Sequence, residues 1–430
     1  MVRKHSEMPI RRDTPRPSFR RTDLKVLEKY KLALASHGLN DSVRILLLLA
    51  LWLKKQERTR DQILAMLCAS VVAEMLDVNA TLANLPRQQP ITCGRYKEPD
   101  EFDDSTFLSQ FRFRKEHFWM FLQALRWTDA AGRPRTIKFG KRYHQYNMPS
   151  HYILMILLCR LAFPARWVDI NLILGGAAST SSSAYNFALC YFFQHYVPLI
   201  TDLHRWKHKF AEFAKRLSDM GAPFDNLVAF VDGHFDPMAR PGGDGNVRYR
   251  PKDYHMFNHL HKDHGIMFQG AVMVNGLALG WGPYGGNEND ARTVDKAGIT
   301  EMMRAISMEL GVDYSNFADS AYTQNRYMQC IQKCLPGAAL SRPARRFNSL
   351  MARFRIVIEN LFGETENIFA SLQHKQNKRL GRQDISKMFL VSLFLFNVRS
   401  IFYGNQTGCY YGLDGLAAIT LEEFLHADAF

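Results

Sequence analysis

The sequence predicts an α/β protein with a mixed β-sheet flanked by helices, preceded by an all-helical N-terminal region. Residues 266–285 (IMFQGAVMVNGLALGWGPYG) predict two strands joined at Asn275-Gly276, a dipeptide that favours tight hairpin turns. Beyond residue 290, helical and strand patterns alternate, which is typical of α/β layers. Upstream of Pro223 the apolar residues recur with helical spacing, so the first half of the chain is expected to be helical.

Each element of the sheet region is predicted from its own pattern. The segment NLVAFVDGHF (226–235) is rich in β-forming residues and predicts a strand that ends at Asp232. After the hairpin we expect a helix over residues 290–310, a short strand ending at Asp319, a helix over 321–335, a strand over 337–341 and a long helix from near Phe347.

The helices near the middle of the chain suggest a second motif. Residues 148–193 predict three short helices, interrupted at Pro164 and at Gly175-Gly176, with the serines of 179–183 available to cap the third. Helix, turn and capped helix is the outline of a helix-turn-helix. Residues 179–189 contain no Lys or Arg, however, so a plain helical bundle is the alternative.

The chain divides into five predicted parts. They are a flexible basic arm at 1–22, a helical extension at 23–95, a helical region with the candidate helix-turn-helix at 96–224, the sheet domain at 225–400 and a C-terminal tail at 401–430. The arm combines Lys and Arg with three prolines, which argues against packing. A nuclear-import signal, a DNA-contacting tail and a solvated terminus all fit its composition.

Composition indicates an intracellular, soluble protein with a polyanionic partner. Lys and Arg number 55 against 41 Asp and Glu, a net charge of +14 that favours nucleic acid or an anionic surface. The seven cysteines show no paired spacing and suggest reduced thiols. No signal peptide is visible, and the longest apolar run, Ile45–Leu53, is about half of the ~20 residues that span a bilayer. We therefore expect no membrane association.

Three acidic residues fall where carboxylates are unexpected. Asp232 and Asp319 end predicted strands, and Glu359 lies on the long helix among apolar residues. Burying such groups without compensation costs several kcal/mol. A divalent cation would compensate them, since Mg²⁺ and Mn²⁺ prefer carboxylate oxygen. An ion pair with Arg355, one helical turn before Glu359, is an alternative that spacing does not distinguish from a metal, and an exposed position would explain Glu359 alone.

Four segments carry a resemblance. FVDGHFD, GLALGWGPYGGNENDA, NFADSAY and FNSLMARFRIVIENLFG resemble, in order and spacing, the DDE domain of PIF/Harbinger-type transposases (the DDE-Tnp-4 type), which includes Harbinger-derived nucleases. The resemblance covers residues 230–369, and two helical segments upstream are similar to the family's N-terminal region. It implies an RNase H-like DDE catalytic domain and a metal-dependent DNA endonuclease or transposase, which hydrolyses phosphodiesters and can join strands.

The resemblance also implies site residues. Asp232, Asp319 and Glu359 would be the catalytic residues and the ligands of two Mg²⁺ or Mn²⁺ ions, with Asp290 and Arg355 in supporting roles. His234 stands where many members have Thr, and GGNENDA replaces the more frequent Gly-x-x-His-Asp, but neither change removes a ligand. The alternative is a domesticated, catalytically silent DNA-binding or protein-interaction factor on the same fold.

Basic clusters on either side of Glu359 suggest where DNA would lie, because Arg and Lys that neutralise phosphates release counterions. The candidate DNA-binding residues are Arg342, Arg345, Arg346, Arg353, Lys375, Lys378 and Arg379. A solvated helix face is the alternative for the second cluster. The resemblance further implies a nuclear protein with a Myb-like DNA-binding partner. The Ile45–Leu53 helix could alternatively mediate homo-oligomerisation.

Overall fold

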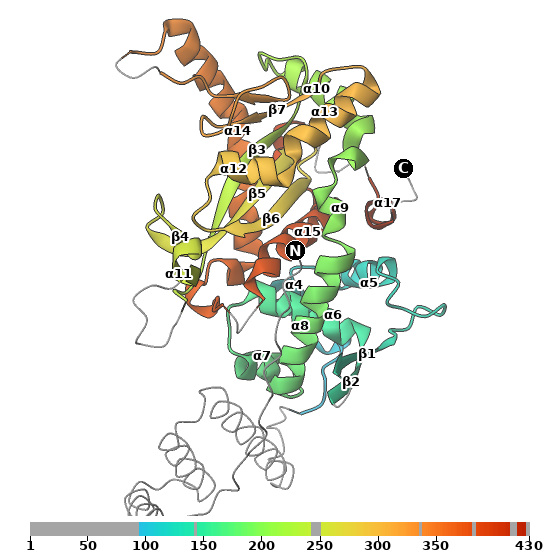
Figure 1. The fold of residues 1–430 in the computed structure, drawn as a ribbon. Coiled ribbons are helices and arrows are strands. Elements are labelled where there is room, and N and C mark those ends of the chain that lie inside the picture. Colours follow the sequence, from blue (N-terminus) through green and yellow to red (C-terminus); the bar gives the residue numbers. More distant parts are fainter. Residues whose placement is uncertain are drawn as a thin grey trace, which may run out of the picture. The chain divides into compact units, whose positions relative to one another are not determined.

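The structure, a computed structural model, describes residues 94–426 except 142–143, 242–250, 335–337, 381–383 and 413–418. The predicted arm at 1–22, nearly all of the extension at 23–95 and the Ile45–Leu53 run lie outside the described residues. Residues 90–430 form one compact unit, and Figure 1 shows its strands and helices.

The elements follow one another in this order along the described chain. They are η1 (Pro99–Glu101), α4 (Asp104–Phe111), α5 (Lys115–Ala124), β1 (Thr136–Lys141), β2 (His144–Pro149), α6 (Ser150–Ala162), α7 (Trp167–Leu174), α8 (Ala178–His195), α9 (Pro198–Thr201), η2 (Leu203–Lys209), α10 (Phe210–Asp219), β3 (Leu227–Pro237), α11 (Pro251–Met256), β4 (Phe257–Asn258), β5 (Asp263–Met273), β6 (Ala278–Gly285), α12 (Asp290–Ala297), α13 (Ile299–Leu310), β7 (Ser315–Ala318), β8 (Met328–Cys330), α14 (Arg342–Ile368), η3 (Ala370–Leu372), η4 (Lys375–Asn377), α15 (Ile385–Tyr403), α16 (Gln406–Tyr410) and α17 (Leu421–Leu425).

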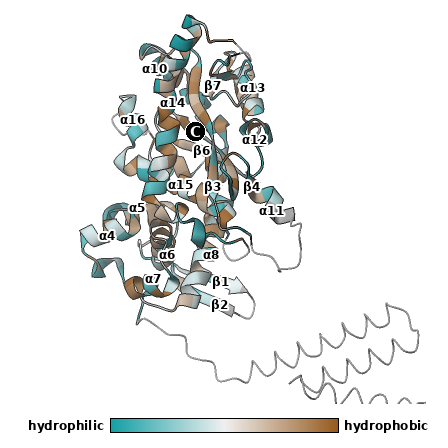
Figure 2. Cartoon of the chain, turned by 90° about the vertical axis from the view of Figure 1, so that its left-hand side faces the viewer, coloured by the Kyte–Doolittle hydropathy of each residue, from teal (hydrophilic) through white to brown (hydrophobic). Residues whose placement is uncertain are grey.

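The mixed sheet that the sequence predicts is confirmed. Its strands run in the order β4-β5-β3-β7-β8, and β6 also pairs with β5. Strand β3 is antiparallel to β5 and parallel to β7, which is parallel to β8. In Figure 2, α12 and α13 lie on one side of the strands, and α14 and α15 lie on the other. The two helical layers bury both faces of the central strands, whose inner residues are fully buried.

The hairpin predicted at Asn275-Gly276 is also confirmed. Strands β5 and β6 flank this turn, where Gly276 has a φ of +75° that side chains other than glycine rarely adopt. A β-carbon on Gly276 would lie 1.7 Å from Oδ1 of Asn405, so the turn is also packed against the segment after α15. Glycine is therefore required here by both conformation and space.

Two predicted elements are wrong, and the predicted long helix is confirmed with an earlier start. Of the helix predicted over 321–335, the described residues 321–334 contain a turn and strand β8 instead, and residues 338–341 form no strand. The long helix α14 begins at Arg342 rather than near Phe347, because Ser341 caps it and Pro343 suits its first turn. Strands β1 and β2 form an antiparallel hairpin in a region that was expected to be helical.

The three helices predicted within residues 148–193 are confirmed as α6, α7 and α8. Every residue of α6 is buried, and α8 packs against α6 on one side and α15 on another. Helix α10 contacts β3 directly. The helices upstream of the sheet therefore share its core.

By length and composition, helix α15 is long and apolar enough to cross a membrane. Most of its apolar stretch (72%) is buried inside the protein. It packs mainly against β6 and α8. Within it, Asn397 is buried and bonds both the N–H and the carbonyl of Ala278 on β6, at 2.7 and 2.8 Å. These contacts are those of a core helix beneath the sheet.

Candidate active site

Two of the predicted acids lie on neighbouring parallel strands. Phe230 on β3 pairs with Phe317 on β7, and this register leads two residues further to Asp232 and Asp319. Asp319 follows the last residue of β7, as predicted. Asp232 does not end its strand, because β3 continues to Pro237 and pairs with β5 along this length. The carboxylate of Asp232 therefore projects from the middle of a rigid strand.

A third acid, Asp290, approaches the same place from α12. Asn289 caps this helix by accepting the N–H of Arg292 at 2.9 Å, which fixes Asp290 in the first turn. A β-carbon on Gly233 would lie only 1.9 Å from Oδ1 of Asp290, so glycine beside Asp232 makes room for this carboxylate. Among the described residues, that Oδ1 atom is buried and has no hydrogen-bond partner.

The three aspartates influence one another electrostatically. The pKa of Asp232 is raised to about 6, mainly by burial. The nearby Arg355 guanidinium lowers this pKa, and the charges of Asp319 and Asp290 raise it. Burial, followed by the charge of Asp319, also raises the pKa of Asp290. Negative charge at this site is therefore only partly compensated by the protein itself. Arrangements of this kind are typical of functional sites.

Arg355 links Asp232 to Glu359. Its Nη1 atom lies 2.5 Å from Oδ2 of Asp232, and its Nη2 atom lies 2.8 Å from Oε1 of Glu359. The side chain of Glu359 is 52% exposed, in contrast to Asp232 at 19%. The ion pair allowed by the sequence spacing is thus present, and Glu359 is exposed, which is the alternative that the sequence left open for it. The apolar residues around it, Val357 and Ile358, face the core instead.

A buried polar network, which the sequence reasoning missed, supports the site. The hydroxyl of Tyr322 donates to Oε1 of Gln269 at 2.8 Å, and the amide of Gln269 donates to Oγ1 of Thr293 at 2.6 Å. This network ties the turn after β7 to β5 and α12. Burial raises the pKa of Tyr322, and the charges of Asp290 and Asp232 raise it further. Tyr322 belongs to the DSAY segment, but nothing in the sequence indicates its partner Gln269.

His234 packs away from the acidic site. Its ring stacks on Phe389 with centroids 4.2 Å apart, and it lies near Phe362 at 4.8 Å. Burial lowers the pKa of His234 to about 3, assisted by the positive charge of Lys378. The histidine at this position is therefore a neutral core residue.

The candidate DNA-binding residues differ in their surroundings. Along α14, Arg342, Arg345, Arg346 and Arg353 are exposed. Lys375 is partly exposed and lies 2.5 Å from a carboxylate oxygen of Asp263, while Arg379 is exposed.

Lys378 is a correction to the sequence-based assignment. Its side chain is completely buried and forms an ion pair with the buried Asp236 on β3. A lysine held in this way cannot contact DNA, because the pair is closed off from solvent. Its role is to fix the loop after α14 against the sheet.

The acidic site fits a hard divalent cation, although no metal cluster is preformed. In the part of the chain that the structure describes, no three His, Cys, Asp or Glu side chains converge closely enough to hold an ion. Mg²⁺, however, is usually held by one or two carboxylates together with water and substrate phosphate. The Oδ1 atom of Asp290 has no hydrogen-bond partner among the described residues, and the pKa of Asp232 stays raised although Arg355 partly compensates its charge. Oxygen donors of this kind suit Mg²⁺ or Mn²⁺.

The mixed sheet, flanked by helices on both faces and carrying Asp232 and Asp319 at its central parallel strands, is that of an RNase H-like α/β domain. Residues 245–397 match the family model of DDE superfamily endonucleases, a little over a third of the chain. The matched segment contains Asp290, Asp319 and Glu359, whereas Asp232 precedes it. No curated protein and no solved structure matches the chain. The similarity indicates a nuclease-type enzyme.

Proposed function

We propose that this protein is a metal-dependent DDE-type DNA endonuclease that hydrolyses phosphodiester bonds. The observation that carries the proposal is that three aspartates, Asp232, Asp290 and Asp319, lie near enough to influence one another electrostatically. The parallel register of β3 and β7 aligns Asp232 with Asp319, and Asp290 of α12 packs over Gly233, the neighbour of Asp232. The similarity of residues 245–397 to DDE endonucleases supports the same reaction class.

In this proposal, Asp232, Asp319 and Asp290 hold one or two divalent cations, and Glu359 joins them from α14. When bound, such ions supply an activated water and stabilise negative charge on the phosphate. Strand β3 orients Asp232, while Asp319 is held by accepting the N–H of Ala321 at 2.7 Å. No side chain of the site is required to act as a general base.

Arg355 has a positioning role in this proposal. Its guanidinium compensates Asp232 and Glu359 in the metal-free protein, because it bonds both carboxylates. With cations bound to these carboxylates, the guanidinium would be available to a phosphate of the DNA. Arg355 would thereby keep two like charges together before the substrate arrives.

The exposed arginines of α14 suit the DNA backbone. Arg342, Arg345, Arg346 and Arg353 lie on the same helix as Glu359, so DNA bound along α14 would lead to the acids. Arg379 would extend this contact. We further propose a Harbinger-type transposase that joins the cleaved strand to target DNA, acts in the nucleus, and works with a Myb-like DNA-binding partner or as a homo-oligomer.

A plasmid-nicking assay tests the reaction. The protein should nick supercoiled DNA with Mg²⁺ or Mn²⁺ and not with EDTA, and Asp319→Asn should lose this activity while remaining folded. Asp295→Asn, a change at an exposed aspartate on α12, is the matched control and should cleave like the wild type.

The competing function is a catalytically silent DNA-binding or interaction factor. That reading predicts DNA binding without metal-dependent nicking. One observation favours this second function: the Arg355 guanidinium lies between Glu359 and the largely buried Asp232 and pairs with both carboxylates. Nicking that is unaffected by both Asp319→Asn and EDTA would reject the proposed site.

A further inference from the structure

A small polar pocket lies between α7, α8 and the loop that contains η4. Its cavity volume is about 240 Å³, and every residue that lines it has a nitrogen or oxygen atom in its side chain. At 240 Å³ the pocket falls below the roughly 300–1,000 Å³ of sites for drug-sized ligands. It therefore suits a single planar ring system with hydrogen-bonding edges.

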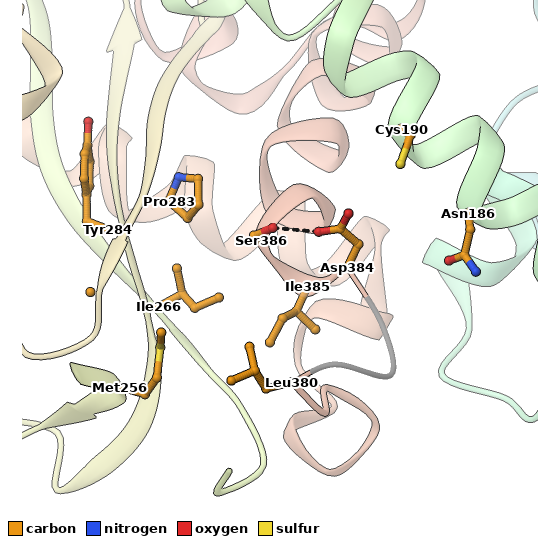
Figure 3. A pocket seen from close by; sticks show the side chains of 11 residues that line it. Asn186, Cys190, Met256, Ile266, Pro283, Tyr284, Leu380, Asp384, Ile385 and Ser386 are labelled. Atoms are coloured by element: carbon orange, nitrogen blue, oxygen red, sulfur yellow. Dashed lines mark hydrogen bonds between the residues drawn. The ribbon is translucent and has the colours of Figure 1, made fainter. Parts of the chain in front are cut away.

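A larger cavity of about 640 Å³ adjoins the polar pocket and shares Asn186 of α8 with it. Figure 3 shows this cavity, with Ile266 and Pro283 on the sheet side, Ile385 of α15 in the middle and Asn186 on α8 at the other side. Its lining is mainly apolar, in contrast to the polar pocket. Asn186 thus stands at the boundary between the two.

The wall of the polar pocket on α7 is an indole ring held in place. The Arg160 guanidinium lies 5.2 Å from the centroid of Trp167, and Tyr185 meets the same ring edge-on at 5.5 Å. These contacts fix the orientation of the half-buried indole. A fixed aromatic side chain provides a platform on which a planar ligand can stack.

The pocket also offers polar groups that are available to a ligand. Tyr185 is 2% exposed and its hydroxyl is buried beneath the pocket, where it has no hydrogen-bond partner among the described residues. Asn186 and Gln376 are exposed amides on opposite walls. Arg379 at the rim is exposed, and none of the ion pairs of the described chain includes it.

We propose that this pocket binds one unpaired nucleobase of a DNA strand, an inference that rests on the proposed action on DNA. Trp167 supplies a stacking surface, the amides of Asn186 and Gln376 match the mixed donor and acceptor edges of bases, and Arg379 meets the adjoining phosphate. Helix α8 carries no Lys or Arg, so it is unsuited to following duplex phosphates as a recognition helix. Its polar residues serve a single base instead.

The test compares two strands with equal charge. Full-length protein is titrated in EDTA with a fluorescein-labelled homothymidylate strand and with an abasic strand of the same length, and binding is followed by anisotropy. Stacking contributes roughly 1–3 kcal/mol per base, so the wild type should prefer the strand with bases by roughly 5- to 150-fold. Trp167→Ala and Asn186→Ala should each reduce this preference.

Matched controls separate the pocket from general effects. Trp119→Ala removes a half-buried indole on α5, and Gln194→Ala removes an exposed amide two turns along α8 from Asn186; both should keep the preference. If the Trp167 variant fails to fold, Asn186→Ala still tests the pocket, because the Asn186 side chain is exposed and its loss should leave the fold intact. Equal affinity of the wild type for both strands, failure to bind either, or an undiminished preference in both pocket variants would overturn the proposal.

The result is independent of cleavage. Base preference is measured without metal, so it can be present in a protein that never nicks DNA, and nicking can persist in a protein without base preference. Absence of the base preference rejects the nucleobase pocket, whereas absence of metal-dependent nicking rejects the proposed endonuclease.

Discussion

Replacing Asp232 by asparagine should make the metal-free protein more stable at neutral pH. Burial raises the pKa of Asp232 from 3.8 to about 6, even with Arg355 beside it. Because the folded protein binds this proton more tightly than the unfolded chain, stability falls as the pH rises from about 4 to about 6 and is level above. A difference of roughly 2 pKa units corresponds to roughly 3 kcal/mol. An asparagine side chain at this position cannot ionise, so the variant should escape this loss.

Urea denaturation in EDTA measures this effect. The stability advantage of Asp232→Asn over the wild type should grow by roughly 3 kcal/mol between about pH 4 and about pH 7.5, since asparagine resembles the protonated acid. Asp295→Asn, on the surface of α12, should show no comparable change. If the free energy of unfolding of Asp232→Asn and of the wild type changed in parallel with pH, the charge of Asp232 would not be poorly compensated, and the reasoning would be refuted.

Three further changes test other parts of the structure. Lys378→Met should destabilise the protein by roughly 3–5 kcal/mol in urea titrations, because it leaves a buried carboxylate unpaired, whereas exposed Arg379→Ala should change stability by less than about 0.5 kcal/mol. Gly233→Ala should reduce nicking at least tenfold, since its β-carbon would displace Asp290; wild-type nicking would show that this position is not needed. Arg346→Ala should lower the salt dependence of DNA binding by about one unit in the log–log slope, and an unchanged slope would place DNA elsewhere.

The sequence predicted elements well wherever local pattern and tertiary structure agree. The β5–β6 hairpin follows from a turn dipeptide between β-forming runs, and three central helices follow from their breakers. The expected helix over 321–335 failed because residues 328–330 pair with β7, a long-range contact that local periodicity does not contain. The β1–β2 hairpin was missed for the same reason.

The candidate site shows the same limit. Position along the chain and family resemblance singled out Asp232, Asp319 and Glu359 as ligands and Asp290 as a supporting residue, and these roles stay predictions. The spacing of Arg355 and Glu359 also allowed their ion pair, which is present. Lys378, however, is indistinguishable in sequence from its exposed neighbour Arg379, because a single acid on β3, far away in the chain, decides that it is buried.

By itself, the sequence determined an α/β chain of basic character, with a mixed sheet and a set of well-spaced acids, since composition and local periodicity are properties of short segments. Only the tertiary structure decided which groups meet. The parallel register of β3 and β7 aligns two aspartates, the absent β-carbon of Gly233 admits a third, and Arg355 stands between Asp232 and Glu359. Such contacts depend on packing between segments tens of residues apart, and no local pattern encodes them.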